Sequence, residues 1–121
     1  MAIFQNPNVV HYSKLLEAEL AAIRQKPDEA RTLFEEAVHL AEGRKEVSAI
    51  AKIEERFAQF ELRQQRTRQA SIHMQRALNH YEEWGAQALC SNLRDQHPEL
   101  MLPIATLDIP NEPGKEVKPE D

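Results

Sequence analysis

The helical spacing of its apolar residues is the feature that most constrains this chain. The segment after Pro27 shows this spacing best, because its apolar side chains recur three and four positions apart and so share one face of a helix. These side chains are Ala30, Leu33, Phe34, Ala37, Leu40 and Ala41. With only three glycines and 6% aromatic residues among 121 residues, the composition also favours helices over sheets. The sequence therefore predicts an all-α protein.

About five helices are expected. The first follows a polar lead-in at residues 1–8, and its apolar residues are Tyr12, Leu15, Leu16, Leu20 and Ile23. Pro27 suits the first turn of the second helix, and Gly43 is expected to end that helix. The third helix spans about 46–62, and the basic segment 63–68 forms the turn into the fourth.

The fourth helix is expected to end at Gly85, and a short fifth helix covers residues 86–96. Leu89 and Leu93 are its predicted buried residues, and Pro98 ends it. The helical domain thus covers residues 9–100. Residues 101–121 contain several prolines among acidic residues, which predicts a flexible, disordered acidic tail.

A repeat becomes visible when the second and fourth helices are aligned. Ala30, Phe34 and Ala37 are followed forty positions later by Ala70, Met74 and Ala77. A small–large–small pattern of this kind allows two helices to approach closely while the larger side chain fills the groove between them. We interpret it as two helical hairpins and a capping helix; a generic helical bundle with accidentally equal spacing is the alternative.

Three aromatic and small residues complete the predicted repeat core at the end of the fourth helix. Tyr81 and Trp84 are expected to be buried there, so that Trp84→Ala would be costly. Gly85 would permit the reversal of the backbone that follows. We assign these residues a structural role.

The residues of the fourth and fifth predicted helices resemble those of a known family. The matching residues are Ala70, Met74, Ala77, Tyr81, Trp84-Gly85-Ala86, Ala88, Leu93, Pro98 and Leu100. They resemble the end of the tetratricopeptide-like repeat region of multidomain serine/threonine kinases and hybrid histidine kinases, where that region follows an AAA/STAND-type ATPase. With Arg56-Phe57 and the turn at 26–30, the similarity covers about residues 12–100. The resemblance implies a short right-handed α–α superhelix that acts as a sensing or scaffolding array, detached from any kinase or ATPase domain.

Charge and cysteine content narrow the classes of partner. The formal net charge of −5 opposes general attraction to nucleic acid or to an anionic membrane. Cys90 is the only cysteine, so neither an intramolecular disulfide nor a thiolate zinc cluster can form within one chain. No signal peptide or membrane-spanning run is evident, and we expect a cytoplasmic protein without a cofactor.

Few residues suggest a catalytic or metal-binding site. Glu36 and His39 have the i, i+3 spacing of carboxylate-bridged metal sites, but a second such pair is missing, so a solvated helix face is the simpler interpretation. His73 and His80 share a helix face and with Cys90 form a second, weaker candidate for a metal site. Cys90 itself is interpreted as a small buried residue. We therefore predict no catalytic and no metal-binding residues.

Arginines form the one basic concentration, near the turn of the second hairpin. They are Arg56, Arg63, Arg66, Arg68 and Arg76. Such a patch suits an acidic protein segment or a phosphate, whereas the missing aromatic residues argue against nucleic acid.

The sequence thus favours a non-enzymatic module for protein–protein interaction or scaffolding in signal transduction, bound to a protein partner or to the rest of a larger chain. The alternative is a self-assembling helical homodimer with a structural role. A metal-dependent enzyme that uses Glu36, His39, His73 or His80 is a third and weaker hypothesis.

Overall fold

The computed structural model describes residues 10–101, and these residues are almost entirely helical. The elements are α1 (Val10–Ile23), α2 (Pro27–Gly43), α3 (Val47–Arg63), α4 (Thr67–Trp84), α5 (Gln87–Gln96) and the short 3-10 helix η3 (Pro98–Met101). This confirms the predicted all-α class and the five helices. The predicted lead-in and nearly all of the predicted tail lie outside the described residues.

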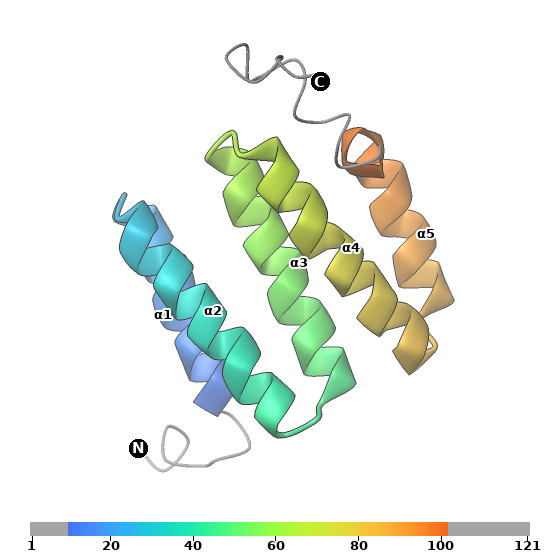
Figure 1. The fold of residues 1–121 in the computed structure, drawn as a ribbon, viewed down its shortest axis with the longest axis horizontal. Coiled ribbons are helices and arrows are strands. Elements are labelled where there is room, and N and C mark those ends of the chain that lie inside the picture. Colours follow the sequence, from blue (N-terminus) through green and yellow to red (C-terminus); the bar gives the residue numbers. More distant parts are fainter. Residues whose placement is uncertain (1–9, 102–121) are drawn as a thin grey trace, which may run out of the picture.

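The helices follow one another across the molecule in chain order, from α1 and α2 at one end to α5 at the other (Figure 1). The most extensive contacts join α1 to α2 and α3 to α4, and those between α2 and α3 are fewer. The chain therefore forms two helical pairs, with α5 and η3 packed on α4.

Four turns with the same hydrogen bonds connect these helices. A residue with left-handed backbone geometry occurs at each, namely Gln25 (φ 61°), Lys45 (φ 58°), Gln65 (φ 63°) and Gly85 (φ 93°). The next amide closes each turn: Lys26 donates to the Ala21 carbonyl at 3.0 Å, and the corresponding bonds recur at intervals of twenty residues. This is the Schellman arrangement that satisfies the last carbonyls of a helix. The turn thus recurs every twenty residues, twice within the forty-residue spacing of the predicted repeat.

Glycine is the left-handed residue in the turn after α4 but not in the turn after α2. Gly85 adopts the left-handed geometry after α4, as the sequence predicted. Gly43, however, is still helical, and the left-handed residue after α2 is Lys45. The prediction that the second helix ends at Gly43 is thus confirmed, although the left-handed residue of the turn lies two positions later.

Replacing each of the two glycines by alanine should therefore change the free energy of unfolding in opposite directions. A side chain at Gly85 would meet no neighbouring atom but would be held at positive φ, so Gly85→Ala should lower the free energy of unfolding by about 1 kcal/mol. Gly43→Ala also meets open space and replaces a poor helix former, so it should raise that free energy by about 0.5 kcal/mol. Urea denaturation followed by circular dichroism measures both. A shift of the same sign in both variants would contradict this account.

The core consists of two hydrophobic clusters that meet at α3. The first joins α1, α2 and one side of α3, with Phe34 packed between Phe57 and Phe60 at ring-centroid distances of 5.0 and 5.2 Å. The second joins the other side of α3 to α4, α5 and η3. All six residues of the predicted small–large–small repeat, and Tyr81, are buried.

Several large apolar side chains lie outside the core, against expectation. Trp84 is 56% exposed, because it follows the last core residue of α4, and its ring lies 6.4 Å from that of Tyr81 between centroids. In α5 the buried residues are Cys90 and Leu93, so Leu89 points outward and is 41% exposed. In α1 the buried apolar residues are Leu15, Ala18 and Ala21. The predictions that Trp84 and Leu89 are buried were therefore wrong, whereas the predicted burial of Leu93 is confirmed.

This difference in burial sets the cost of truncating two aromatic residues. Phe34 is completely buried, so Phe34→Ala should lower the free energy of unfolding by about 3–5 kcal/mol. Trp84→Ala leaves no internal cavity and should cost about 1 kcal/mol or less, contrary to the value expected for a buried tryptophan. Chemical denaturation of both variants tests the contrast, and equal losses would contradict it.

Candidate functional site

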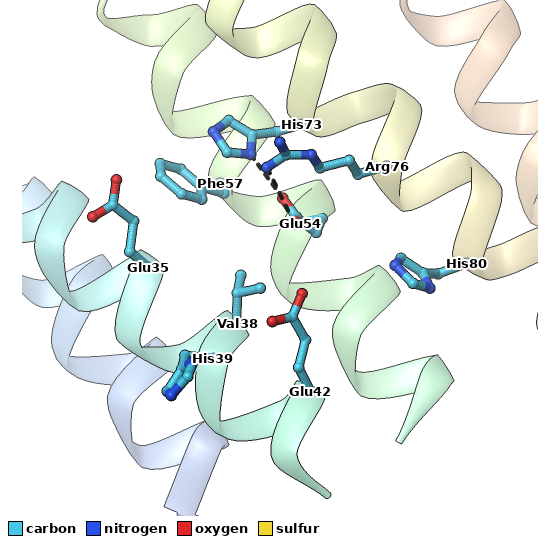
Figure 2. Close-up of a pocket in the computed structure, with 9 residues that line it drawn as sticks. All are labelled: Glu35, Val38, His39, Glu42, Glu54, Phe57, His73, Arg76 and His80. Carbon is cyan, nitrogen blue, oxygen red and sulfur yellow. Dashed lines mark hydrogen bonds and ion pairs between the residues drawn. The ribbon is translucent and has the colours of Figure 1, made fainter. Parts of the chain in front are cut away.

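A groove runs between α2 and α4, with α3 as its floor (Figure 2). It has a volume of about 560 Å³, within the range of ligand-binding pockets. Its lining consists of Glu35, Val38, His39 and Glu42 from α2, Glu54 and Phe57 from α3, and His73, Arg76 and His80 from α4.

The side chains at the floor of the groove contact one another closely. The His73 ring stacks on Phe57 with 3.8 Å between centroids and an interplanar angle of 20°. Its Nδ1 atom lies 2.7 Å from Oε1 of the buried Glu54 (Figure 2). Arg76 approaches the second oxygen of Glu54 at 4.0 Å. The Glu54 carboxylate is thus partnered, as burial of a charge requires.

The two walls of the groove differ in charge. Glu35 and Glu42 stand exposed on the α2 wall, whereas His73, Arg76 and His80 come from the α4 wall (Figure 2). Within residues 10–101, Glu42 forms no salt bridge, and Glu35 has only a longer-range attraction to Arg31. Since Arg76 is directed to Glu54, the α2 wall keeps an uncompensated negative charge that a cationic ligand would meet.

The Glu54–His73 pair resembles a general-base arrangement, but no nucleophile accompanies it among the residues that line the groove. Ser71 is buried elsewhere and donates to the Leu100 carbonyl at 2.8 Å. Cys90 is buried beneath α4 with its thiol 3.7 Å from the Leu78 carbonyl, and burial raises the pKa of that thiol. Neither Ser71 nor Cys90 lines the groove.

The residues considered for metal binding are placed as follows. Glu36 is exposed and pairs with Lys14 at 3.3 Å, while His39 lies on the groove wall. His73 and His80 line the same groove, but Cys90 lies in the second hydrophobic cluster. No group of three or more ligating side chains with metal-binding geometry occurs among residues 10–101.

The structure distributes the five predicted arginines over different surroundings. Arg76 lines the groove, whereas Arg56 pairs with Glu19 of α1 at 3.6 Å. Arg63, Arg66 and Arg68 remain near the turn between α3 and α4. A role for these three arginines in binding stays a prediction. Arg66 also contributes to the structure, because its Nε lies 3.1 Å from the buried Glu61.

Glu61 is the centre of a second buried ion cluster. The Arg31 guanidinium donates two hydrogen bonds to it, from Nε at 2.8 Å and from a terminal nitrogen at 3.1 Å, and these bonds raise the pKa of Arg31. Arg31 also lies over the Phe60 ring at 5.5 Å. The cluster ties α2 to α3 and to the following turn. Sequence reasoning missed both Glu54 and Glu61, although their spacing of seven residues beside the apolar stripe of α3 was a usable signal.

Removing the Glu61 charge should destabilise the protein. Glu61→Gln leaves Arg31 and Arg66 facing a neutral, partly mismatched amide, and we expect a loss of about 2 kcal/mol in the free energy of unfolding. Glu36→Gln removes an exposed charge from α2 and should change it by less than about 0.5 kcal/mol. Urea denaturation at neutral pH compares the two. An equally mild effect at Glu61 would show that the cluster contributes little to stability.

Comparison of the chain with protein-family models, with curated proteins and with solved structures finds no match. The resemblance to the tetratricopeptide-like region and the implied superhelix therefore stay predictions. None of the described helices has the length and apolar character needed to span a membrane.

Proposed function

We propose that this protein is a non-enzymatic interaction module whose groove between α2 and α4 binds an extended, basic segment of a partner protein. The observation that carries the proposal is the groove itself, with its stacked Phe57–His73 floor and its acidic α2 wall.

Each part of the groove supports a basic segment. Lys or Arg side chains lay their aliphatic stems on apolar surface while the charged head reaches outward. The half-buried Val38 supplies apolar surface in the groove, and Glu35 and Glu42 supply the acceptors at its edge. Imidazoles at His39 and His80 can donate or accept hydrogen bonds from the backbone of such a segment.

A scaffolding role in signal transduction, which the resemblance implies, fits a module of this kind. An enzymatic function lacks support from the groove, since the Glu54–His73 pair is directed to Phe57 and Arg76 and not to a nucleophile. The proposed partner class differs from that of the arginine patch, for which an acidic segment was expected.

Charge reversal on the α2 wall tests the proposal. Fluorescence anisotropy would measure binding of a labelled peptide of alternating Lys and Ala residues, beside a peptide of alternating Glu and Ala. We expect the basic peptide to bind and the double variant Glu35→Lys, Glu42→Lys to weaken it about tenfold or more, because two attractive charges become repulsive.

The matched control carries the same change in net charge away from the groove, at two exposed residues, Glu29→Lys and Asp95→Lys. Its affinity for the basic peptide should stay within about twofold of the unchanged protein. If both double variants weaken binding equally, the basic peptide binds only through general charge attraction and not in the groove. If the basic peptide does not bind at all, the proposal is wrong.

A further inference from the structure

Helix α1 carries an apolar stripe on the side that faces away from the core. Tyr12, Leu16, Leu20 and Ile23 are spaced by three and four residues and share this face. Their exposed fractions are 38%, 63%, 44% and 75%, respectively. A contiguous exposed apolar surface of this kind indicates an interface.

The repeat of the fold does not itself require this stripe. The positions forty residues later in α3 are Lys52, Arg56, Phe60 and Arg63. Of these, only Phe60 is buried, and the three exposed positions are all basic. The same solvent-facing positions thus carry charges in α3 and large apolar groups in α1, which points to a surface that something covers.

We propose that a second copy of this chain covers it, with the two α1 helices packed antiparallel across a two-fold axis. A two-fold interface must be complementary to itself. Beside the stripe, between α1 and α2, lies a hollow of about 220 Å³ lined by Leu20, Ala21 and Leu33, with charged side chains around them. Ile23 projects from the same face, so one surface offers both an apolar knob and a hollow to receive one.

The charges beside the stripe are also self-complementary. Glu17 and Arg24 are exposed, lie seven residues apart and flank the stripe on one side. In an antiparallel pair, equivalent flanks face each other, so Glu17 of each copy comes within reach of Arg24 of the other. A parallel pair would instead bring opposite flanks together, so Glu17 and Arg24 of the two copies would not meet. The stripe and the groove share no residue, so this interface leaves the groove accessible.

Sedimentation velocity of the full chain, from low micromolar to millimolar concentration, tests the interface. We expect a reversible monomer–dimer equilibrium in the micromolar range, because a contact made by one helix is small. Leu20→Glu should weaken it about thirtyfold or more, since the pairing of Glu17 with Arg24 places Leu20 beside the two-fold axis, at the centre of the contact. The control is Leu89→Glu, which changes a similarly exposed leucine on α5 and should have no effect. A monomer at every concentration, or equal effects of the two variants, would overturn the proposal.

A charge exchange tests the antiparallel arrangement and does not depend on the apolar variant. Glu17→Arg and Arg24→Glu should each weaken self-association about tenfold, because each homodimer then holds two pairs of like charges. A one-to-one mixture of these two variants restores both pairs and should dimerise like the unchanged protein. Circular dichroism confirms that each variant is folded. Failure of the mixture to recover would overturn the antiparallel pairing.

Discussion

Burial of α3 on both sides is the constraint on which the rest of the structure depends. Phe57 and Phe60 face α2 and Phe34, while Ala51 and Ala58 belong to the cluster formed with α4 and α5. A helix covered from two sides leaves little room for charged groups, so Glu54 and Glu61 need partners from neighbouring helices. Those partners, His73 and Arg31, come from α4 and α2: the Glu54–His73 contact joins α3 to α4 within one pair, and the Glu61–Arg31 contact joins the two helical pairs to each other. The groove floor is one result of this pairing.

The helices and turns were largely predictable from the sequence. Their limits follow from local chemistry, as at Pro27 in the first turn of α2 and at Gly85 after α4. The turn between α3 and α4 was also anticipated within 63–68, although it has no glycine. What local chemistry did not reveal is that Gln25, Lys45 and Gln65 all take the left-handed geometry. Non-glycine residues rarely adopt it, and here the hydrogen bonds of the turn and the packing of the flanking helices impose it.

Burial was harder to predict, and α1 shows why. Periodicity identifies an apolar face but does not say which of two faces packs inward. In α1 the large side chains of Leu16, Leu20 and Ile23 define the stronger stripe, yet the small residues Ala18 and Ala21 face α2, because they allow the close contact between the paired helices. The candidate site was less predictable still. Its salt bridges join residues far apart in sequence, such as Glu54 and His73, and no local pattern pairs them.

The two proposed surfaces reinforce each other physically. One groove binds one extended segment, and contacts of this type are individually weak because both walls remain open to water. Pairing through α1 would place two grooves in one assembly without covering either. A partner with two basic segments would then bind the second groove as an intramolecular step, at an effective concentration set by the chain between the segments. Self-association would therefore raise the apparent affinity for a bivalent partner without any new contact in the groove, and the exposed apolar stripe of α1 would serve the same binding function as the groove.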